Sequence, residues 1–294
     1  MEFVLQIILN SIVLGTQILF LAISLFLIKA VSKIEHVSLG AIGVAVAYMF
    51  YLGQTLHVGV WFSVLLSLLA ATLLGLLSYF LLEKFCKNNQ ILLALLVSLS
   101  FGIGIESVIA LVFKSGAKNI IDGVLPIMSF AGITITLPGL YTLILGVLLV
   151  IITYVIVKKT PAGRILRSIS ENQSLVATLG VNQKRVRKMV YIISSIIAGM
   201  VGILLAMNTS LTPTLGFTYI MIAFIALFVG GPTDIRGTIV ASYIIILIPE
   251  FLINFAPANM QFTSSYRMFF IFVIACIVLS IKPRGIFSKT VRQT

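Results

Sequence analysis

The chain has 294 residues, of which 60% are hydrophobic and only 10% are charged, and its mean hydropathy is +1.18. Soluble domains average about 45–50% apolar and about 25% charged residues, so the composition excludes a soluble enzyme, a disordered chain and a collagen-like fibre. The net charge of +12 does not indicate nucleic-acid binding, because the basic residues lie at the ends of apolar segments. We expect an all-α, polytopic membrane protein with a single transmembrane domain over residues 1–294.

Nine apolar segments bounded by polar residues are candidates for membrane helices. They lie at residues 5–29, 37–53, 60–82, 91–113, 138–157, 190–209, 216–230, 238–255 and 265–281. The first is expected to be a retained span, because no basic region of a signal peptide precedes it. The seventh is short and follows Pro213, so it is either a ninth crossing or a re-entrant half-helix that leaves eight crossings.

The distribution of Lys and Arg predicts the orientation of the spans, since these residues concentrate in short cytoplasmic loops. With the loop at 158–189 placed inside, 17 of the 20 basic residues fall on the inner side. The three on the outer side are Lys114, Lys118 and Arg267. We therefore expect nine spans with the amino terminus outside, and with the loop at 158–189 and the tail after Lys282 both in the cytoplasm.

Two connections are long enough to carry structure. The outer one, 114–137, contains several glycines and the alternating segment 133–136, which predict a small external hairpin. The inner one, 158–189, begins a turn at Thr160-Pro161 and then places apolar residues at helical spacing before Gly180. It carries eight basic residues and one acid, which predicts a short amphipathic helix pair.

The sequence contains no signature of catalysis, cofactor binding or metal binding. The glycine-rich segment 230–237 lacks the Lys of a phosphate-binding loop. Cys86 and Cys276 have neither the spacing of metal ligands nor that of a disulfide framework, and His36 and His57 are expected to be interfacial anchors. The chain is therefore not expected to be an enzyme or to bind ATP itself.

Two acids fall within the apolar spans, where an ionisable group normally faces a protein interior or a water-filled path. Glu106 and Glu250 lie roughly 10 Å and 8 Å from the outer ends of their predicted helices at 1.5 Å per residue. One interpretation is that both line an external vestibule or substrate path. The alternative is a structural role, with each acid hydrogen-bonded near Pro249 or beside Gly102 and Gly104.

Small residues recur at every fourth position in two of the predicted spans. Span six carries Ser194, Ala198, Gly202 and Ala206, and span two carries the pairs Ala41 with Ala45 and Gly43 with Ala47. Such spacing lets helix backbones approach closely in lipid. It predicts tight helix packing and does not indicate a substrate.

Residues in the inner loop and in the segments after it match the pattern of a known family. They are Thr160, Gly163, Arg164, Arg167, Asn172, Ala177 and Gly180, then Ala198, Gly199 and Gly202. They continue with Pro213, Gly216, Ala223, Phe224, Gly230, Gly231, Gly237 and Glu250, and with Pro283 and Gly285. On these residues the chain resembles the membrane-spanning permease subunits of branched-chain amino-acid ABC importers, which are related to urea and nucleoside permeases.

The resemblance implies a type II importer-like permease in the cell membrane of a prokaryote. Its implied partners are a second permease subunit, two cytoplasmic ATPases that bind ATP and Mg, an external solute-binding protein and membrane lipid. We expect a coupling helix at 168–181 to dock on an ATPase through Arg164, Arg167, Asn172, Leu175, Val176, Ala177, Leu179 and Gly180. The substrate path is expected near Gly40, Gly43, Glu106 and Glu250.

Three departures from the family pattern leave the substrate open, one of which is that the outer connections are less acidic than expected. The segment 233–236 replaces a Gly-Ser pair after the double glycine, and the early Asn and His-Gly signature is represented only by residues 35–41. A gradient-driven secondary transporter or channel is the alternative class, although the chain shows no convincing internal repeat. The inner loop could also simply rest on anionic lipid.

Overall fold

The computed structural model describes residues 2–87, 90–120, 127–130, 132–255 and 266–287. The helices are α1 (Glu2–Ser32), α2 (Leu39–Thr55), α3 (Val60–Lys87), α4 (Ile91–Phe113), α5 (Leu137–Lys159), α6 (Pro161–Glu171), α7 (Gln173–Thr178), α8 (Gln183–Asn208), α9 (Leu215–Gly230), α10 (Ile235–Asn254) and α11 (Arg267–Ile281). Two short strands, β1 (Ile127–Phe130) and β2 (Ile133–Thr136), pair antiparallel with Phe130 opposite Ile133. The fold is helical, as the composition predicted.

Each of the nine predicted apolar segments coincides with a helix. Six of these helices are long and apolar enough to cross a membrane, whereas α2, α9 and α11 are shorter. The largest boundary error is in α8, which begins at Gln183 rather than at residue 190 because the Asn182 side chain accepts a hydrogen bond from the Arg185 backbone N–H. A polar cap of this kind starts a helix before its apolar stretch begins.

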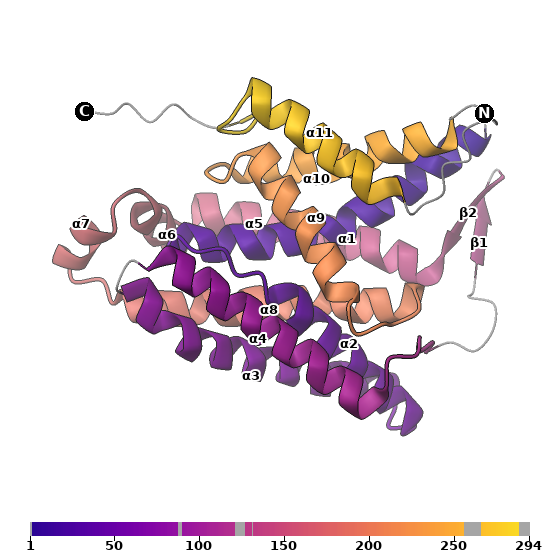
Figure 1. Ribbon diagram of the computed structural model, residues 1–294, viewed down its shortest axis with the longest axis horizontal. Helices are drawn as coiled ribbons and strands as arrows, with labels where there is room; N and C mark the ends of the chain where they lie inside the picture. Colours follow the sequence, from indigo (N-terminus) through magenta and orange to yellow (C-terminus); the bar gives the residue numbers. More distant parts are fainter. Residues whose placement is uncertain (1, 88–89, 121–126, 131, 256–265, 288–294) are drawn as a thin grey trace.

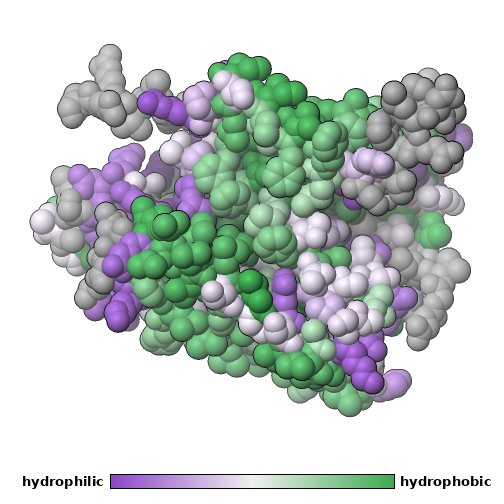
Figure 2. Space-filling model, viewed as in Figure 1, coloured by the Kyte–Doolittle hydropathy of each residue, from purple (hydrophilic) through white to green (hydrophobic). Residues whose placement is uncertain are grey.

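Helices α1 and α8 form the interior of the bundle. Of the most apolar 18 residues in each helix, 83% are buried in α1 and 72% in α8, against 17% in α4. Helices α3, α4 and α5 instead expose long rows of Leu, Ile and Val. Figure 2 shows this apolar surface across the middle of the molecule and hydrophilic residues toward the end that carries α6 and α7. Such a band is what lipid covers in a membrane protein.

The two ends of the bundle carry different structures, as Figure 1 shows. The hairpin β1–β2 lies at the end where α1 begins, and the Gln6 side chain both donates to the Thr134 carbonyl and accepts from the Thr134 backbone N–H. Helices α6 and α7 lie at the opposite end, where the Gln173 side chain donates to the Val31 carbonyl. The external hairpin predicted from the sequence is thus confirmed as a hairpin.

The segment after α11 folds back on the turn between α9 and α10. The Ile286 and Phe287 backbone N–H groups donate to the carbonyls of Val229 and Gly230 at 2.9 and 3.2 Å. Lys29, near the end of α1, lies 4.0 Å from the ring centre of Phe228 in the same region. The described part of the tail therefore shares an end of the molecule with α6 and α7, and the assignment of that end to the cytoplasm stays a prediction from the basic residues.

The stripe of small residues on α8 lies against α2. Ser194, Ala198, Gly202 and Ala206 are all buried. A β-carbon added to Gly202 would lie 1.9 Å from the Gly43 carbonyl oxygen, so the two backbones are in direct contact. Small residues permit this approach, which increases van der Waals contact between helices in lipid.

Candidate functional site

The first feature of the site is a break in the chain between α1 and α2. Residues 33–38 are not helical, and Lys33 has a φ of +57°. The Ser38 backbone N–H donates to the Ser98 hydroxyl at 3.1 Å, and the Ser38 hydroxyl lies 2.9 Å from Nδ1 of His36. His36 is fully buried, with its ring 5.3 Å from that of Tyr191. The expectation that His36 is an interfacial anchor is therefore wrong, because this break carries it into the protein interior.

The break places the start of α2 against the start of α9. A β-carbon on Gly40 would lie 2.3 Å from the Gly216 carbonyl oxygen, and one on Gly216 would lie 2.4 Å from the Gly40 carbonyl oxygen. Both helices are short, with 17 and 16 residues. Their amino-terminal ends, which carry partial positive charge, therefore meet inside the bundle.

Glu106 on α4 lies at this junction. It lies beside Phe217, in the first turn of α9. A small cavity of about 20 Å³ beside it is also lined by Ser38 and Ala41 from the start of α2 and by Gly102 from α4. A carboxylate next to helix amino termini is electrostatically favourable. Glu106 is half-buried, and it lies where α2, α4 and α9 meet.

The two glycines predicted to lie near a substrate path are covered by neighbouring helices. Gly40 contacts α9, and a β-carbon on Gly43 would lie 2.9 Å from the Ala198 carbonyl oxygen on α8. Neither residue lines an open channel in this structure. A path at Gly40 or Gly43 therefore requires α2 to separate from α9 or α8.

Glu250 lies in a different environment from Glu106. Its Oε1 atom is 2.5 Å from Nη2 of Arg267 at the start of α11, and the two side chains are 12% and 29% exposed. Asn254, one helical turn later, donates from its side chain to the Glu250 carbonyl at 2.8 Å. The sequence alone did not indicate that Arg267 pairs with Glu250. One feature of the sequence could have indicated this ion pair, because an acid and a base lie at the predicted outer ends of two consecutive spans.

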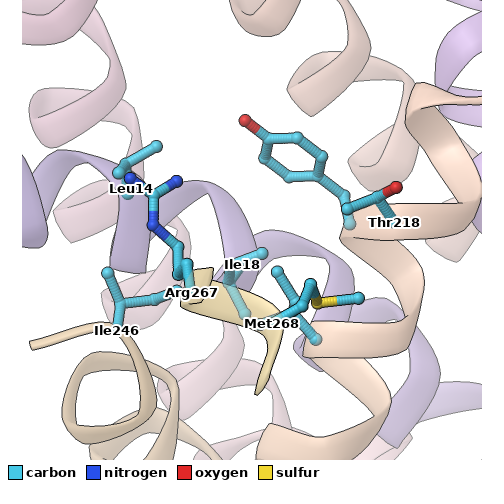
Figure 3. Close-up of a pocket in the computed structure, with 8 residues that line it drawn as sticks. Leu14, Ile18, Thr218, Ile246, Arg267 and Met268 are labelled. Carbon is cyan, nitrogen blue, oxygen red and sulfur yellow. The ribbon is translucent and has the colours of Figure 1, made fainter. Parts of the chain in front are cut away.

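Arg267 also lines a cavity of about 230 Å³ between α1, α9, α10 and α11 (Figure 3). Leu14, Ile18 and Ile246 contribute apolar walls, and Thr218 contributes from α9. The cavities beside Glu106 and Arg267 both contact the first two turns of α9, but they share no lining residue. The structure therefore does not bring Glu106 and Glu250 into one site.

Two further ion pairs were not anticipated from the sequence. Arg187 near the start of α8 lies 3.2 Å from Glu83 near the end of α3, and Lys29 on α1 lies 2.5 Å from Glu35. Arg187 is buried, so it is not one of the basic residues available to a partner or to lipid. Residue spacing did not indicate the Arg187–Glu83 pair, because this ion pair depends on α3 and α8 being neighbours in the fold.

The inner loop forms the predicted helix pair, but it breaks at a different place from the one expected. The Thr160 hydroxyl caps α6 by accepting from the Gly163 backbone N–H at 3.1 Å. Asn172, with a φ of −148° and a ψ of 99°, ends α6. The single coupling helix expected at 168–181 is therefore wrong, because the extended backbone at Asn172 divides it between α6 and α7.

The side chains of the loop separate into a buried set and an exposed set. Leu166, Ile169 and Val176 belong to the hydrophobic core. Val176 is 2% exposed, so the prediction that it contacts an ATPase does not fit its burial. By contrast, Leu179 is 72% exposed, so it is accessible to a partner. The side chains of Leu175 and Ala177 lie outside the described part of the structure.

The exposed set includes the tight turn at Gly180. Gly180 has a φ of +78°, a conformation that residues with a β-carbon rarely adopt. It is exposed together with Leu179 and with Arg164 and Arg167 on α6. An exposed large apolar side chain such as Leu179 is the kind of surface that a protein partner covers.

Among the described residues, no group of three His, Cys, Asp or Glu side chains is placed to hold a metal ion. Taken together, the site features are a membrane bundle, two short helices whose amino termini meet inside it and an exposed loop at one end. These features define a polytopic helical membrane protein.

Comparison with known proteins identifies the family. The family described as "Branched-chain amino acid transport system / permease component" matches residues 7–279, and the chain belongs to it. The chain is 25% identical to the "Probable branched-chain amino acid transport permease protein LivH" of Methanocaldococcus jannaschii, over 94% of this chain and 90% of that protein. No solved structure matches it.

Relatives named for sugar transport also match the chain. The "Fructose import permease protein FruG" of Bifidobacterium longum is 28% identical over 80% of this chain and 74% of that protein. The "Ribose import permease protein RbsC" of Haemophilus influenzae is 28% identical over 40% of this chain and 37% of that protein. Family membership therefore establishes a permease, and the relatives differ in the solutes for which they are named.

Proposed function

We propose that this chain is the membrane-spanning permease subunit of an ATP-driven importer for branched-chain or related amino acids. It forms the translocation path together with a second permease subunit, which is a different chain. Two cytoplasmic ATPases hydrolyse ATP with Mg, and an external solute-binding protein delivers the substrate. The family membership over residues 7–279 is the observation that carries this proposal.

Coupling to the ATPases is assigned to the surface formed by Arg164, Arg167, Leu179 and Gly180. These residues are exposed at one end of the bundle, and α6 and α7 are held to that end by buried Leu166, Ile169 and Val176. Movement of the loop is therefore transmitted to the bundle through packed side chains. Asn172, where α6 ends, and the neighbouring Leu175 and Ala177 complete the proposed contact segment.

The junction of α2, α4 and α9 is the proposed gate of the substrate path. Glu106 lies beside Phe217 in the first turn of α9, while Gly40 and Gly216 keep α2 and α9 in backbone contact. Separation of the two short helices would open the path and free the Glu106 carboxylate. Broken helices that meet inside a membrane protein are a common way to build such sites.

Replacing Glu106 and Glu250 separately with glutamine is expected to give different results. Glu250→Gln leaves the Arg267 charge partly buried without its partner, so we expect a loss of stability of about 1–3 kcal/mol. Glu106→Gln keeps the size of this half-buried side chain and removes only its charge, so we expect near-normal stability with altered uptake. Thermal unfolding and uptake measured on the same preparations distinguish the two effects.

The double variant Glu250→Gln with Arg267→Gln is the control for the ion pair. It removes both charges, so part of the stability lost in Glu250→Gln should return. Equal stability of Glu250→Gln and the wild type would show that the pair is not structural. If Glu106→Gln loses stability in parallel with uptake, the gate assignment is wrong.

The substrate class is tested by uptake of labelled solutes into vesicles that contain the assembled importer. We expect leucine, isoleucine or valine to be taken up and to compete with one another, and ribose and fructose to have no effect at the same concentration. Uptake of a sugar without uptake of an amino acid would assign the chain to the solutes of its sugar-named relatives instead.

A further inference from the structure

The cavity that Arg267 lines combines aliphatic walls with one charged group. It has a volume of about 230 Å³ and lies between α1, α9, α10 and α11 (Figure 3). Its apolar walls include Ile18, Ile222 and Ile246, all of which are buried. Among the described residues that line it, Arg267 alone is charged. Sites for drug-sized molecules usually enclose about 300–1,000 Å³, so this cavity fits a small solute.

The Arg267 guanidinium has a donor that is not used within the described structure. Its Nη2 atom lies 2.5 Å from Oε1 of Glu250. Its Nε atom is buried and has no hydrogen-bond acceptor among the residues that the structure describes. A guanidinium carries several N–H donors, and a buried donor without an acceptor costs free energy. Figure 3 shows the Arg267 side chain extending from the start of α11 toward Leu14 of α1. The guanidinium can therefore donate to a ligand carboxylate while it keeps its contact with Glu250.

Glu250 places a negative charge at the edge of the same cavity. It follows Ile246 by one helical turn, so the two side chains lie on the same face of α10. Ile246 lines the cavity, and the Glu250 side chain is only 12% exposed. A carboxylate and a guanidinium are thus held side by side next to aliphatic walls. This arrangement is complementary to a solute that carries both charges and an apolar group.

The cavity lies toward the end of the bundle that carries β1 and β2. The turn after α9 and the segment after α11 lie together at the opposite end, where the Ile286 backbone N–H donates to the Val229 carbonyl. Thr218 and Arg267 stand in the first turns of α9 and α11, so they lie at the hairpin end. The distribution of Lys and Arg predicts that this end is external. An importer receives its solute from that side, and Thr218 is exposed there.

We propose that this cavity binds one zwitterionic α-amino acid with an aliphatic side chain. The ligand carboxylate accepts hydrogen bonds from Arg267, the ligand ammonium donates to Glu250, and the ligand side chain packs against Ile18 and Ile222. This inference rests on the proposed function and adds to it a site that selects the solute. A sugar has no charge to pair with Arg267 or Glu250, and aliphatic walls leave its hydroxyl groups without partners, which is costly.

Binding of leucine to the importer tests the site, with the permease subunits and ATPases purified together and without the solute-binding protein or ATP. Calorimetry is expected to show leucine binding, and valine, which has one methylene fewer, should bind about fourfold more weakly. Isocaproate lacks the ammonium group and leucinamide lacks the carboxylate, so each should bind at least about tenfold more weakly than leucine. Equal affinity for leucine, isocaproate and leucinamide, or no leucine binding by the wild type, would overturn the proposal.

Glu250→Gln with Arg267→Gln removes both charges from the cavity and is expected to weaken leucine binding about 100-fold, as the product of the two losses. The matched control is Lys29→Gln with Glu35→Gln, which removes an ion pair at the opposite end of the bundle and should leave leucine affinity unchanged. Equal leucine affinities in the two double variants would overturn the site. If the first double variant does not fold, the comparison of leucine with isocaproate and leucinamide on the wild type decides.

Failure of this site and failure of the proposed function give different results. If the wild-type importer takes up leucine and the Glu250→Gln with Arg267→Gln variant binds it normally, the site is wrong and the proposed function stands. If the wild type takes up ribose or fructose and neither binds nor takes up leucine, both the site and the amino-acid assignment are wrong.

Discussion

Replacing Gly202 with alanine is expected to destabilise the folded chain by about 2 kcal/mol or more, although alanine is the better helix former. The added β-carbon would lie 1.9 Å from the Gly43 carbonyl oxygen and 2.7 Å from the Gly43 carbonyl carbon. These are backbone atoms, so α2 must move away from α8 as a whole. Overpacking of an interior typically costs about 1–3 kcal/mol, and loss of the α2–α8 contact adds to that cost.

The matched control is Gly104→Ala on α4, where a β-carbon meets no atom within 4 Å. There the helix gains up to about 1 kcal/mol from the better propensity of alanine, so the variant should be as stable as the wild type or more stable. Thermal unfolding of both variants in the same detergent measures the difference. Equal midpoints for Gly202→Ala and Gly104→Ala would contradict the packing assigned to α2 and α8.

Leu179→Glu is expected to abolish co-purification of the ATPase subunits and substrate-stimulated ATP hydrolysis, while the permease remains folded. Leu179 is 72% exposed, so the substitution removes no core contact. In the proposed complex, however, it would bury an unpaired carboxylate, which costs several kcal/mol. Gly180→Asp should act in the same way, since aspartate tolerates the positive φ of that turn better than most residues.

The control for this prediction is Leu56→Glu, which makes the same change at another exposed leucine, in the turn between α2 and α3. It is expected to leave ATPase binding unchanged, because that turn lies at the opposite end of α3 from the Glu83–Arg187 pair and from the start of α8. Normal ATPase binding in both Leu179→Glu and Gly180→Asp would remove this surface from the coupling contact. An equal loss of ATPase binding in Leu56→Glu would show that the effect is not specific to the turn at Leu179.

Apolar segments and caps were enough to predict which parts of the chain are helical. Lipid solvation requires a continuous run of apolar residues for each span, and such runs are visible in one sequence. Thr160-Pro161 and Gly180 likewise marked the start and end of the inner helix pair, because each imposes a local backbone conformation. The small residues of α8 predicted a tight contact, but their spacing did not name α2 as the neighbour.

The parts of the site that the sequence did not predict depend on which helices are neighbours in the fold. The pairing of Glu250 with Arg267 and the burial of Val176 are both tertiary properties. Helical spacing grouped Val176 with Leu179, but α7 ends at Thr178, so Leu179 lies in the turn that follows and does not share the buried face of the helix. Glu106 was identified as notable because it interrupts an apolar span, whereas its place beside Phe217 at the start of α9 depends on which helices are neighbours.

The central claim is that a separate ATPase drives transport through this chain. It is tested most directly by uptake into sealed vesicles containing the permease subunits and the ATPases, with the solute-binding protein supplied on the outer face. We expect uptake to require ATP and Mg on the ATPase side, to continue when ion gradients are collapsed, and to stop with Leu179→Glu. Uptake by the permease alone that follows an ion gradient and ignores ATP would contradict the account and identify a secondary transporter.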